Sequence, residues 1–267
     1  MVGLAWRLHQ AFLMGDRLDE FEDLLGLVHR MRYQVLSVRQ WIDRLEAGRT
    51  REGRVLVLRH DVDTDPPTAL RMAELEHGLG MRGSFYFRLR TFDDRVVRRL
   101  LEMGMDVGYH FEEIATFAKR HRLGCPRAVL ARMPEIADAF VANLSALRVR
   151  YRLPFDVACS HGDWANRALR LPNHALLADP ALRARAGVAH EVYDAALVEP
   201  LVARFSDCDR PALWRPADPR AALQAGLSPV KILVHPSQWK ASVRHNLREL
   251  ATRSGEAVAC AGWGRRP

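Results

Sequence analysis

The chain has little cysteine and no paired cysteine motif. Its 267 residues include four cysteines, none of which forms a CxxC pair or follows zinc-ribbon spacing. The sequence therefore gives no sign of a disulfide framework or of a cysteine-based zinc site. We expect a reduced, cytoplasmic protein.

Long apolar runs and clustered charges are missing as well. No segment reaches the roughly 18 apolar residues of a membrane-spanning helix, and the N-terminal stretch lacks the uninterrupted apolar core of a signal peptide. The net charge of +8 comes mostly from arginines spread along the chain, without a run of five basic residues. Since nucleic-acid-binding modules usually concentrate their charge, we expect no nucleic-acid partner. The basic character fits an anionic substrate or surface without identifying one.

The chain does contain an alternation of strand-like and helix-like segments. Apolar, β-branched or aromatic runs cover residues 55–60, 83–89, 105–110, 155–161, 201–207 and 230–235. Helical periodicity lies before, between and after them, at 17–31, 41–48, 64–80, 93–104, 127–150 and 239–253. This alternation predicts an α/β fold in which helices cover a parallel sheet, either a barrel or an open sheet. We expect a single domain over residues 1–267, with its core at about 34–253.

The first of these strands runs directly into a cluster of acids, in the sequence RVLVLRHDVDTD at 54–65. Side chains alternate along a strand, so Arg59, Asp61 and Asp63 share one face and His60 lies on the other. Charged side chains at the carboxyl ends of parallel strands usually belong to a ligand site. Two carboxylates this close repel each other unless a cation lies between them. The pattern therefore predicts a metal ion near Asp61 and Asp63.

Helix capping is the structural alternative for these acids. The following helix begins at Pro66, and Thr64 or Asp65 is well placed to cap it. Asp61 lies too far back along the chain to serve as a cap. Capping therefore does not explain the whole cluster.

Histidines end three other predicted strands. His110, His161 and His235 are the last residues of the third, fourth and last of them. A lone histidine is more often structural, and we expect His60 to be a hydrogen-bonded core residue. Three histidines at the same end of a parallel sheet, beside a DxD sequence, favour a shared site instead. Histidine with carboxylate is the ligand set of zinc or a similar divalent ion.

The order of these motifs resembles the polysaccharide deacetylase superfamily, the NodB-homology hydrolases. The carrying segments are LRHDVD, SFYFR, MGMDVGYHFE and a late VHP, and the similarity extends from about residue 34 to 253. Within that superfamily, the chain is most similar to the divergent branch found in surface-glycan and O-antigen biosynthesis. The resemblance implies a distorted (β/α) barrel of about seven strands, related to the TIM architecture. It also implies a zinc-dependent or similar hydrolase that removes an N-acetyl group from an amino sugar.

The resemblance assigns roles to four residues. Asp61 matches the catalytic base and Asp63 the carboxylate metal ligand of the family. His110 matches the first metal-binding histidine, and His235 matches the histidine that protonates the departing amine.

The second family motif is incomplete here. The family has two metal-binding histidines four residues apart, but Ile114 stands four residues after His110. A third ligand must come from elsewhere, or the site is weakened or lost. We select His161, with Glu112 and Glu113 as alternatives.

Several residues are candidates for holding the substrate or steadying the base. The arginine of the family's arginine–proline motif has no counterpart near His161, and Arg59, Arg88 or Arg167 could replace it. In the segment FSDCDRPALWR (205–215), Asp207 is expected to contact substrate or orient a catalytic group, and Trp214 to offer a flat face to a sugar ring. A surface turn around Asp209 and Pro211 is the alternative there. The substrate-binding candidates are Arg59, Arg88, Glu112, Asp207 and Trp214.

Three functions are compatible with this pattern. The first is a deacetylase acting on a small-molecule or lipid-linked sugar. The second is a hydrolase of another carbon–nitrogen bond, such as a formamide or ureide. The third is a catalytically silent barrel that binds a glycan or a partner protein. The sequence does not indicate an oligomeric state.

Overall fold

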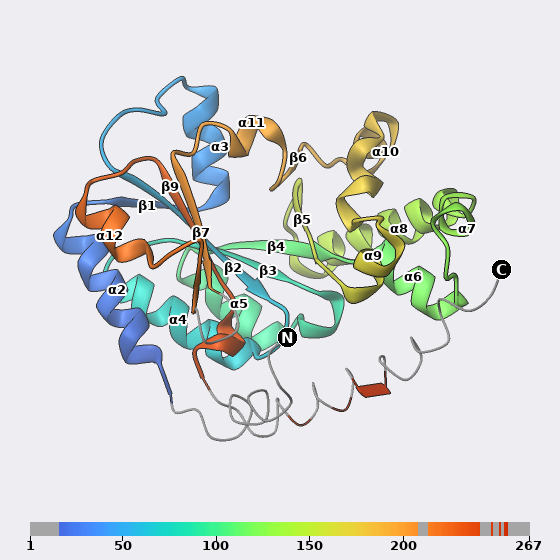
Figure 1. Cartoon of the computed structure of the whole chain (residues 1–267), viewed down its shortest axis with the longest axis horizontal. Helices are drawn as coiled ribbons and strands as arrows, with labels where there is room; N and C mark the ends of the chain where they lie inside the picture. Colours follow the sequence, from blue (N-terminus) through green and yellow to red (C-terminus); the bar gives the residue numbers. More distant parts are fainter. Residues whose placement is uncertain (1–15, 208–212, 241–246, 248–250, 252–253, 256–267) are drawn as a thin grey trace. The chain divides into compact units, whose positions relative to one another are not determined.

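The computed structural model describes residues 16–207 and 213–240, together with 247, 251, 254 and 255 (Figure 1). The chain divides into two compact units. Of the described residues, unit 1 contains 16–107, 195–207, 213–240 and 247, and unit 2 contains Gly108–Asp194 with 251, 254 and 255. The prediction of a single domain stays a prediction. Most of the helix predicted for 239–253 lies outside the described residues.

Unit 1 is built around β2, whose eight residues are all buried. Strand β9 covers one edge of β2, and β1 and β3 share the other edge. Leu56 pairs with both Val35 and Val230, and three residues later Arg59 pairs with Ser84 and Leu233. These pairings are parallel, and β7 continues the sheet in parallel on the far side of β9, while β8 is antiparallel to β7. The strands are β1 (Gln34–Leu36), β2 (Val55–Val62), β3 (Ser84–Phe87), β7 (Ala203–Asp207), β8 (Trp214–Arg215) and β9 (Val230–Val234).

The helices of unit 1 bury one face of β2 and β9 in a common core. Leu56 and Leu58 of β2 and Ile232 of β9 pack in one hydrophobic cluster with α2 residues such as Phe21. Helix α2 contacts α4 and α12, and α3 contacts β2 and α11. The elements are α2 (Leu18–Arg30), α3 (Val38–Glu46), α4 (Pro66–Gly78), η1 (Leu89–Thr91), α5 (Asp94–Glu102), α11 (Ala195–Val198), α12 (Pro219–Gln224) and η3 (Pro236–Gln238).

His60 is a core histidine, as expected. It lies on the helix-facing side of β2, fully buried, with Nε2 2.8 Å from Glu76 Oε1 of α4. Its ring stacks on Phe85 with centroids 4.0 Å apart. The alternation predicted for β2 is therefore confirmed on this face, which leaves Arg59 and Asp61 for the other.

Unit 2 contains three parallel strands and a layer of helices. Strand β4 (Asp106–Phe111) begins in unit 1 and ends in unit 2, where it pairs with β5 (Val157–Ser160), and β5 pairs with β6 (His190–Glu191). Helix α6 contacts α8 and α9, and α8 contacts α10. The helices are α6 (Glu113–His121), α7 (Pro126–Leu130), α8 (Met133–Tyr151), α9 (Trp164–Leu169), η2 (Asn173–Ala178) and α10 (Pro180–Ala186).

The α/β class predicted from the sequence is confirmed, and the strand count differs. All six predicted strands are present, but the described residues contain nine strands rather than about seven. The additional ones, β1, β6 and β8, have two or three residues each, too few for a recognisable alternation. Among the helices of the described residues, none is both long enough and apolar enough to cross a membrane.

Candidate functional site

The carboxylate of Asp61 is buried at the end of β2 and held by an arginine of the same strand face. Arg59 Nη2 donates to Asp61 Oδ2 at 2.9 Å, and the side chains are 0% and 4% exposed. Two residues separate them, so strand alternation alone points both side chains the same way. Arg59, one of the three arginines considered for steadying the base, contacts Asp61 in this structure. The guanidinium stabilises the ionised form of a carboxylate that would otherwise lose hydration on burial.

His235 stands at the end of the neighbouring strand. The parallel register pairs His60 with Val234, so Asp61 and His235 are the next residues along β2 and β9. The His235 side chain is 25% exposed, whereas Asp61 is almost fully buried. The end of the sheet thus presents a buried carboxylate beside an imidazole that solvent or a ligand can reach.

Asp207 anchors His235 through both of its carboxylate oxygens. Oδ1 lies 2.5 Å from His235 Nδ1, and Oδ2 accepts from the His235 backbone N–H at 2.7 Å. Oδ2 also accepts from Trp239 Nε1 at 2.9 Å. Asp207 is 5% exposed and ends β7, the strand beyond β9. Of the two roles predicted for Asp207, this geometry corresponds to orienting a catalytic group.

The charges around His235 favour its protonated form. Burial alone would lower the pKa of His235. The carboxylate of Asp207, followed by those of Asp63 and Asp61, has the larger and opposite effect, so the pKa is raised from 6.5 to about 10. With Nδ1 facing Asp207, Nε2 is the ring nitrogen left to meet a ligand. These charges favour the imidazolium, the form that can give a proton away.

Asp63 and Arg88 extend the site beyond the paired part of the strands. Val62 pairs with Phe87, so Asp63 and Arg88 are the next residues of β2 and its neighbour β3. Asp63 is half-buried, whereas Asp61 is 3% exposed, so Asp63 lies farther out along the strand. Arg88 is only 5% exposed, so it is not a surface arginine.

The capping alternative accounts for Asp65 and no other acid of the cluster. Asp65 is the N-cap of α4, and its carboxylate accepts from the Thr68 backbone N–H at 3.2 Å and from the Thr68 hydroxyl at 2.7 Å. It has a left-handed backbone (φ 58°), which aspartate tolerates better than most residues. Asp61 and Asp63 remain available for another role.

Unit 2 brings His110 and His161 together on neighbouring strands. The two rings are edge-to-face with centroids 5.1 Å apart. His110 is 2% exposed, and its Nδ1 lies 3.1 Å from the backbone oxygen of Cys159. An Nδ1–H donated to a carbonyl fixes the tautomer that leaves Nε2 as a ligand atom, the usual arrangement of a metal-binding histidine.

A group of side chains in unit 2 could hold a metal ion. Glu112, His161 and Asp163 each offer a ligand atom within 4.8 Å of the others, and Glu112 Oε2 lies 3.5 Å from His161 Nδ1. Asp163 also caps α9 through the Ala165 N–H at 2.8 Å and pairs with Lys119 Nζ at 2.7 Å. Asp163 therefore has structural roles in addition to any ligand role. The predicted set Asp63, His110 and His161 comes from both units.

Two tryptophans of unit 1 differ from the sequence-based expectation. Trp214 is 4% exposed and packs in the hydrophobic core, edge-to-face with Trp239 at 5.7 Å, so it has almost no surface to offer a sugar ring. Trp239, assigned only to a closing helix, instead donates to Asp207. Its position four residues after His235 gave no signal, because a single tryptophan has no periodicity. The turn predicted around Asp209 and Pro211 lies outside the described residues.

No protein-family model matches this chain, and no curated protein matches it either. The argument about function therefore rests on the motifs and on the geometry of the two units.

Proposed function

We propose that this protein is a metal-dependent hydrolase that removes an N-acetyl or related N-acyl group from an amino sugar during surface-polysaccharide biosynthesis. The observation that carries the proposal is the pair of groups at the ends of β2 and β9. Arg59-bound Asp61 is a proton acceptor, and Asp207-bound His235 is a proton donor. Amide hydrolysis needs both, since water must lose a proton and the departing nitrogen must gain one.

The two groups have different environments, and these suit different tasks. Asp61 keeps its negative charge beside a guanidinium, so it can accept a proton from the attacking water. His235 carries a proton because three carboxylates surround it, so it can protonate the leaving nitrogen. Asp207 and Trp239 fix the ring so that Nε2 is presented to the substrate. A pair of titratable groups with opposite preferences is the usual sign of an acid–base assignment.

A zinc or other divalent ion is part of the proposal. When bound, such an ion polarises the amide oxygen and lowers the pKa of water. Asp63, His110 and His161 are the proposed ligands, with Glu112 as the alternative third one. That these residues bind one ion together rests on the resemblance to the polysaccharide deacetylases. The tautomer of His110 fits a ligand role, because Nδ1 is occupied by the Cys159 carbonyl.

The resemblance also supplies the finer features of the proposal. These are a distorted (β/α) barrel of the deacetylase type, a cytoplasmic location and a small-molecule or lipid-linked sugar substrate. Binding alone would need neither a buried Arg–Asp pair nor an Asp–His pair beside it. The geometry of unit 1 therefore favours a hydrolase over a catalytically silent barrel.

The proposal is tested by separating proton transfer from metal binding. Asp61→Asn should retain stoichiometric zinc and lose about 10²–10⁴-fold in kcat, as expected for loss of a general base. Asp63→Ala should lose both zinc and turnover. Metal content by atomic emission and acetate release from N-acetylated sugars, measured on both variants, give the answer. Full activity in zinc-loaded Asp61→Asn would overturn the mechanism.

The third ligand is identified by a matched pair of variants. His161→Ala and Glu112→Ala are compared in zinc affinity, with His110→Ala as the positive control for loss of the ion. If His161 is the ligand, His161→Ala should bind zinc at least ten-fold more weakly than Glu112→Ala. The reverse order would assign the position to Glu112, and unchanged zinc in His110→Ala would remove the metal site from the proposal.

A further inference from the structure

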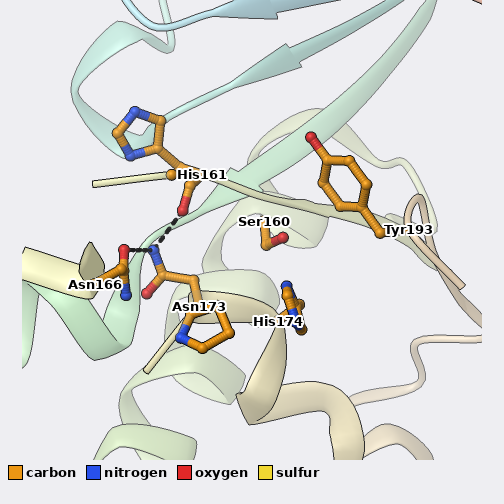
Figure 2. Close-up of a pocket in the computed structure, with 8 residues that line it drawn as sticks. Ser160, His161, Asn166, Asn173, His174 and Tyr193 are labelled. Carbon is orange, nitrogen blue, oxygen red and sulfur yellow. Dashed lines mark hydrogen bonds between the residues drawn. The ribbon is translucent and has the colours of Figure 1, made fainter. Parts of the chain in front are cut away.

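Unit 2 contains a cavity of about 300 Å³ on the opposite face of β5 from the His110–His161 pair. Phe111 pairs with Ser160, and His110 pairs with Cys159, so Ser160 faces away from the side shared by Cys159 and His161. Figure 2 shows the ring of His161 turned away from Tyr193 and His174, while its backbone borders the cavity. The cavity is thus separate from the imidazoles assigned to the metal.

The walls of the cavity are fixed by buried hydrogen bonds. Asn173, 1% exposed, donates to the His161 carbonyl at 2.6 Å and to Asn166 Oδ1 at 2.9 Å (Figure 2). On the other side Glu191, 2% exposed, accepts from the backbone N–H groups of Ser160 at 2.8 Å and Tyr193 at 2.7 Å. These polar groups form hydrogen bonds within unit 2 that hold the segments around the cavity in place. The cavity is therefore part of the fold of unit 2.

One polar group in the wall is left for a ligand. Ser160 is 6% exposed, and its hydroxyl points toward the side where Tyr193 and His174 lie (Figure 2). None of the residues that the structure describes is hydrogen-bonded to this hydroxyl. This hydroxyl can therefore exchange a hydrogen bond with a hydroxyl group of a bound ligand.

The residues that line the cavity favour an uncharged ring as the ligand. Tyr193 is 44% exposed and supplies an aromatic face at the cavity, and His174 supplies an exposed imidazole. The residues that line the cavity include no aspartate, glutamate, lysine or arginine, so it offers no charge to a phosphate or carboxylate. A pyranose ring has apolar C–H faces that pack on an aromatic ring and hydroxyl groups that exchange hydrogen bonds with serine and histidine.

We propose that this cavity is a binding site for one neutral pyranose ring, placed between Tyr193 and Ser160. The choice of a sugar as the occupant rests on the proposed function. The ligand class is therefore a neutral sugar residue, free or as part of a longer glycan. The base of a nucleotide-linked sugar would also pack on Tyr193. Such a sugar carries a diphosphate, and the residues that line the cavity include no lysine or arginine to bind it.

Binding of neutral sugars to the full-length protein tests this proposal. Saturation-transfer NMR and calorimetry with methyl glycosides of glucose, galactose and N-acetylglucosamine should show saturable binding of at least one. Tyr193→Ala should raise its Kd about 2- to 10-fold through loss of the aromatic contact, and Tyr193→Phe should retain most of it. Ser160→Ala should raise the Kd by a similar factor, because one hydrogen bond is lost. Val149→Ala is the control, since Val149 is 81% exposed on α8 and does not line the cavity.

The outcomes separate this inference from the proposed function. Asp61→Asn should bind the glycoside as the wild type does, although it has lost turnover. Glycoside binding that is unchanged in both Tyr193→Ala and Ser160→Ala overturns the site, whatever the activity. Saturable binding of uridine in place of the glycosides, sensitive to Tyr193→Ala, also overturns it. Glycoside binding that depends on Tyr193, in a protein without deacetylase activity, would uphold the site and reject the proposed function.

Discussion

Replacing Asp207 with asparagine should lower the pKa of His235 and so reduce the share of imidazolium near neutral pH. The pKa of His235 is raised from 6.5 to about 10, which corresponds to roughly 5 kcal/mol in favour of the charged ring. Burial acts against this, so the carboxylates supply more than the net value, and Asp207 is the first of them and the one in contact. Loss of an adjacent opposite charge changes a pKa by about 1–3 pKa units, so we expect a fall of that size.

The hydrogen bonds of Asp207 make the asparagine more disruptive than simple loss of charge. Asp207 Oδ2 accepts from the His235 backbone N–H and from Trp239 Nε1, and only the amide oxygen of asparagine can take that place. The amide NH₂ must then face His235 Nδ1 as a donor, which favours an unprotonated Nδ1. The substitution therefore favours the neutral tautomer with its proton on Nε2 and lowers the fraction of His235 that can act as an acid.

The titration of His235 can be followed directly. Protein labelled with ¹⁵N-histidine, stripped of metal, is titrated from pH 5 to about 11, and the His235 resonance is identified by its absence in His235→Gln. Because the folded-state pKa is raised, the stabilising contribution of His235 is fully present below about pH 6.5 and is lost as the pH rises through 10. The wild type should therefore lose resistance to urea between these values more steeply than Asp207→Asn. A wild-type His235 that titrates near 6.5, or an unchanged value in Asp207→Asn, would refute the reasoning.

Two further substitutions test the neighbours of these groups. Arg59→Ala removes the guanidinium partner of Asp61, a carboxylate that is 3% exposed. We expect this variant to lower the free energy of unfolding in urea by about 3–5 kcal/mol at pH 7. A loss below about 1 kcal/mol would show that Asp61 does not depend on this pair. Trp239→Phe keeps the aromatic packing but removes one hydrogen bond to Asp207. We expect a loss of about 1.5–3 kcal/mol in stability and a lower kcat with nearly unchanged KM. A rise in KM alone would place Trp239 in substrate binding instead.

The sequence predicts best the features that depend on one strand alone. Alternation places Arg59 and Asp61 on one face of β2 and His60 on the other, and the structure shows an Arg59–Asp61 ion pair and a His60–Glu76 pair on opposite sides. The cap at Asp65 depends only on its position before two prolines. Such local geometry is fixed by the backbone period, which is visible in any single sequence.

Features that depend on strand order are harder to predict. The sequence predicts that Asp207 contacts substrate or orients a catalytic group. Its contact with His235 requires β7 to lie beside β9, and no sequence pattern predicts that the two strands are neighbours. The orientation of Trp214 depends on β8 pairing antiparallel with β7 over two residues only. A pairing this short has no periodicity, so an aromatic residue expected at a sugar is found in the core.

The end of β5 combines a feature that follows from one strand alone with a feature that depends on strand order. Alternation alone separates Ser160 from His161, so one strand end can serve an imidazole site on one face and a sugar cavity on the other. Tyr193, which completes that cavity, follows the two-residue strand β6, and its position depends on Glu191 bridging the backbones of both segments. A glutamate that binds two backbone N–H groups is indistinguishable in sequence from a surface glutamate. The aromatic wall of the cavity therefore becomes visible only when the strands are assembled, although the hydroxyl that it faces could be placed from the sequence.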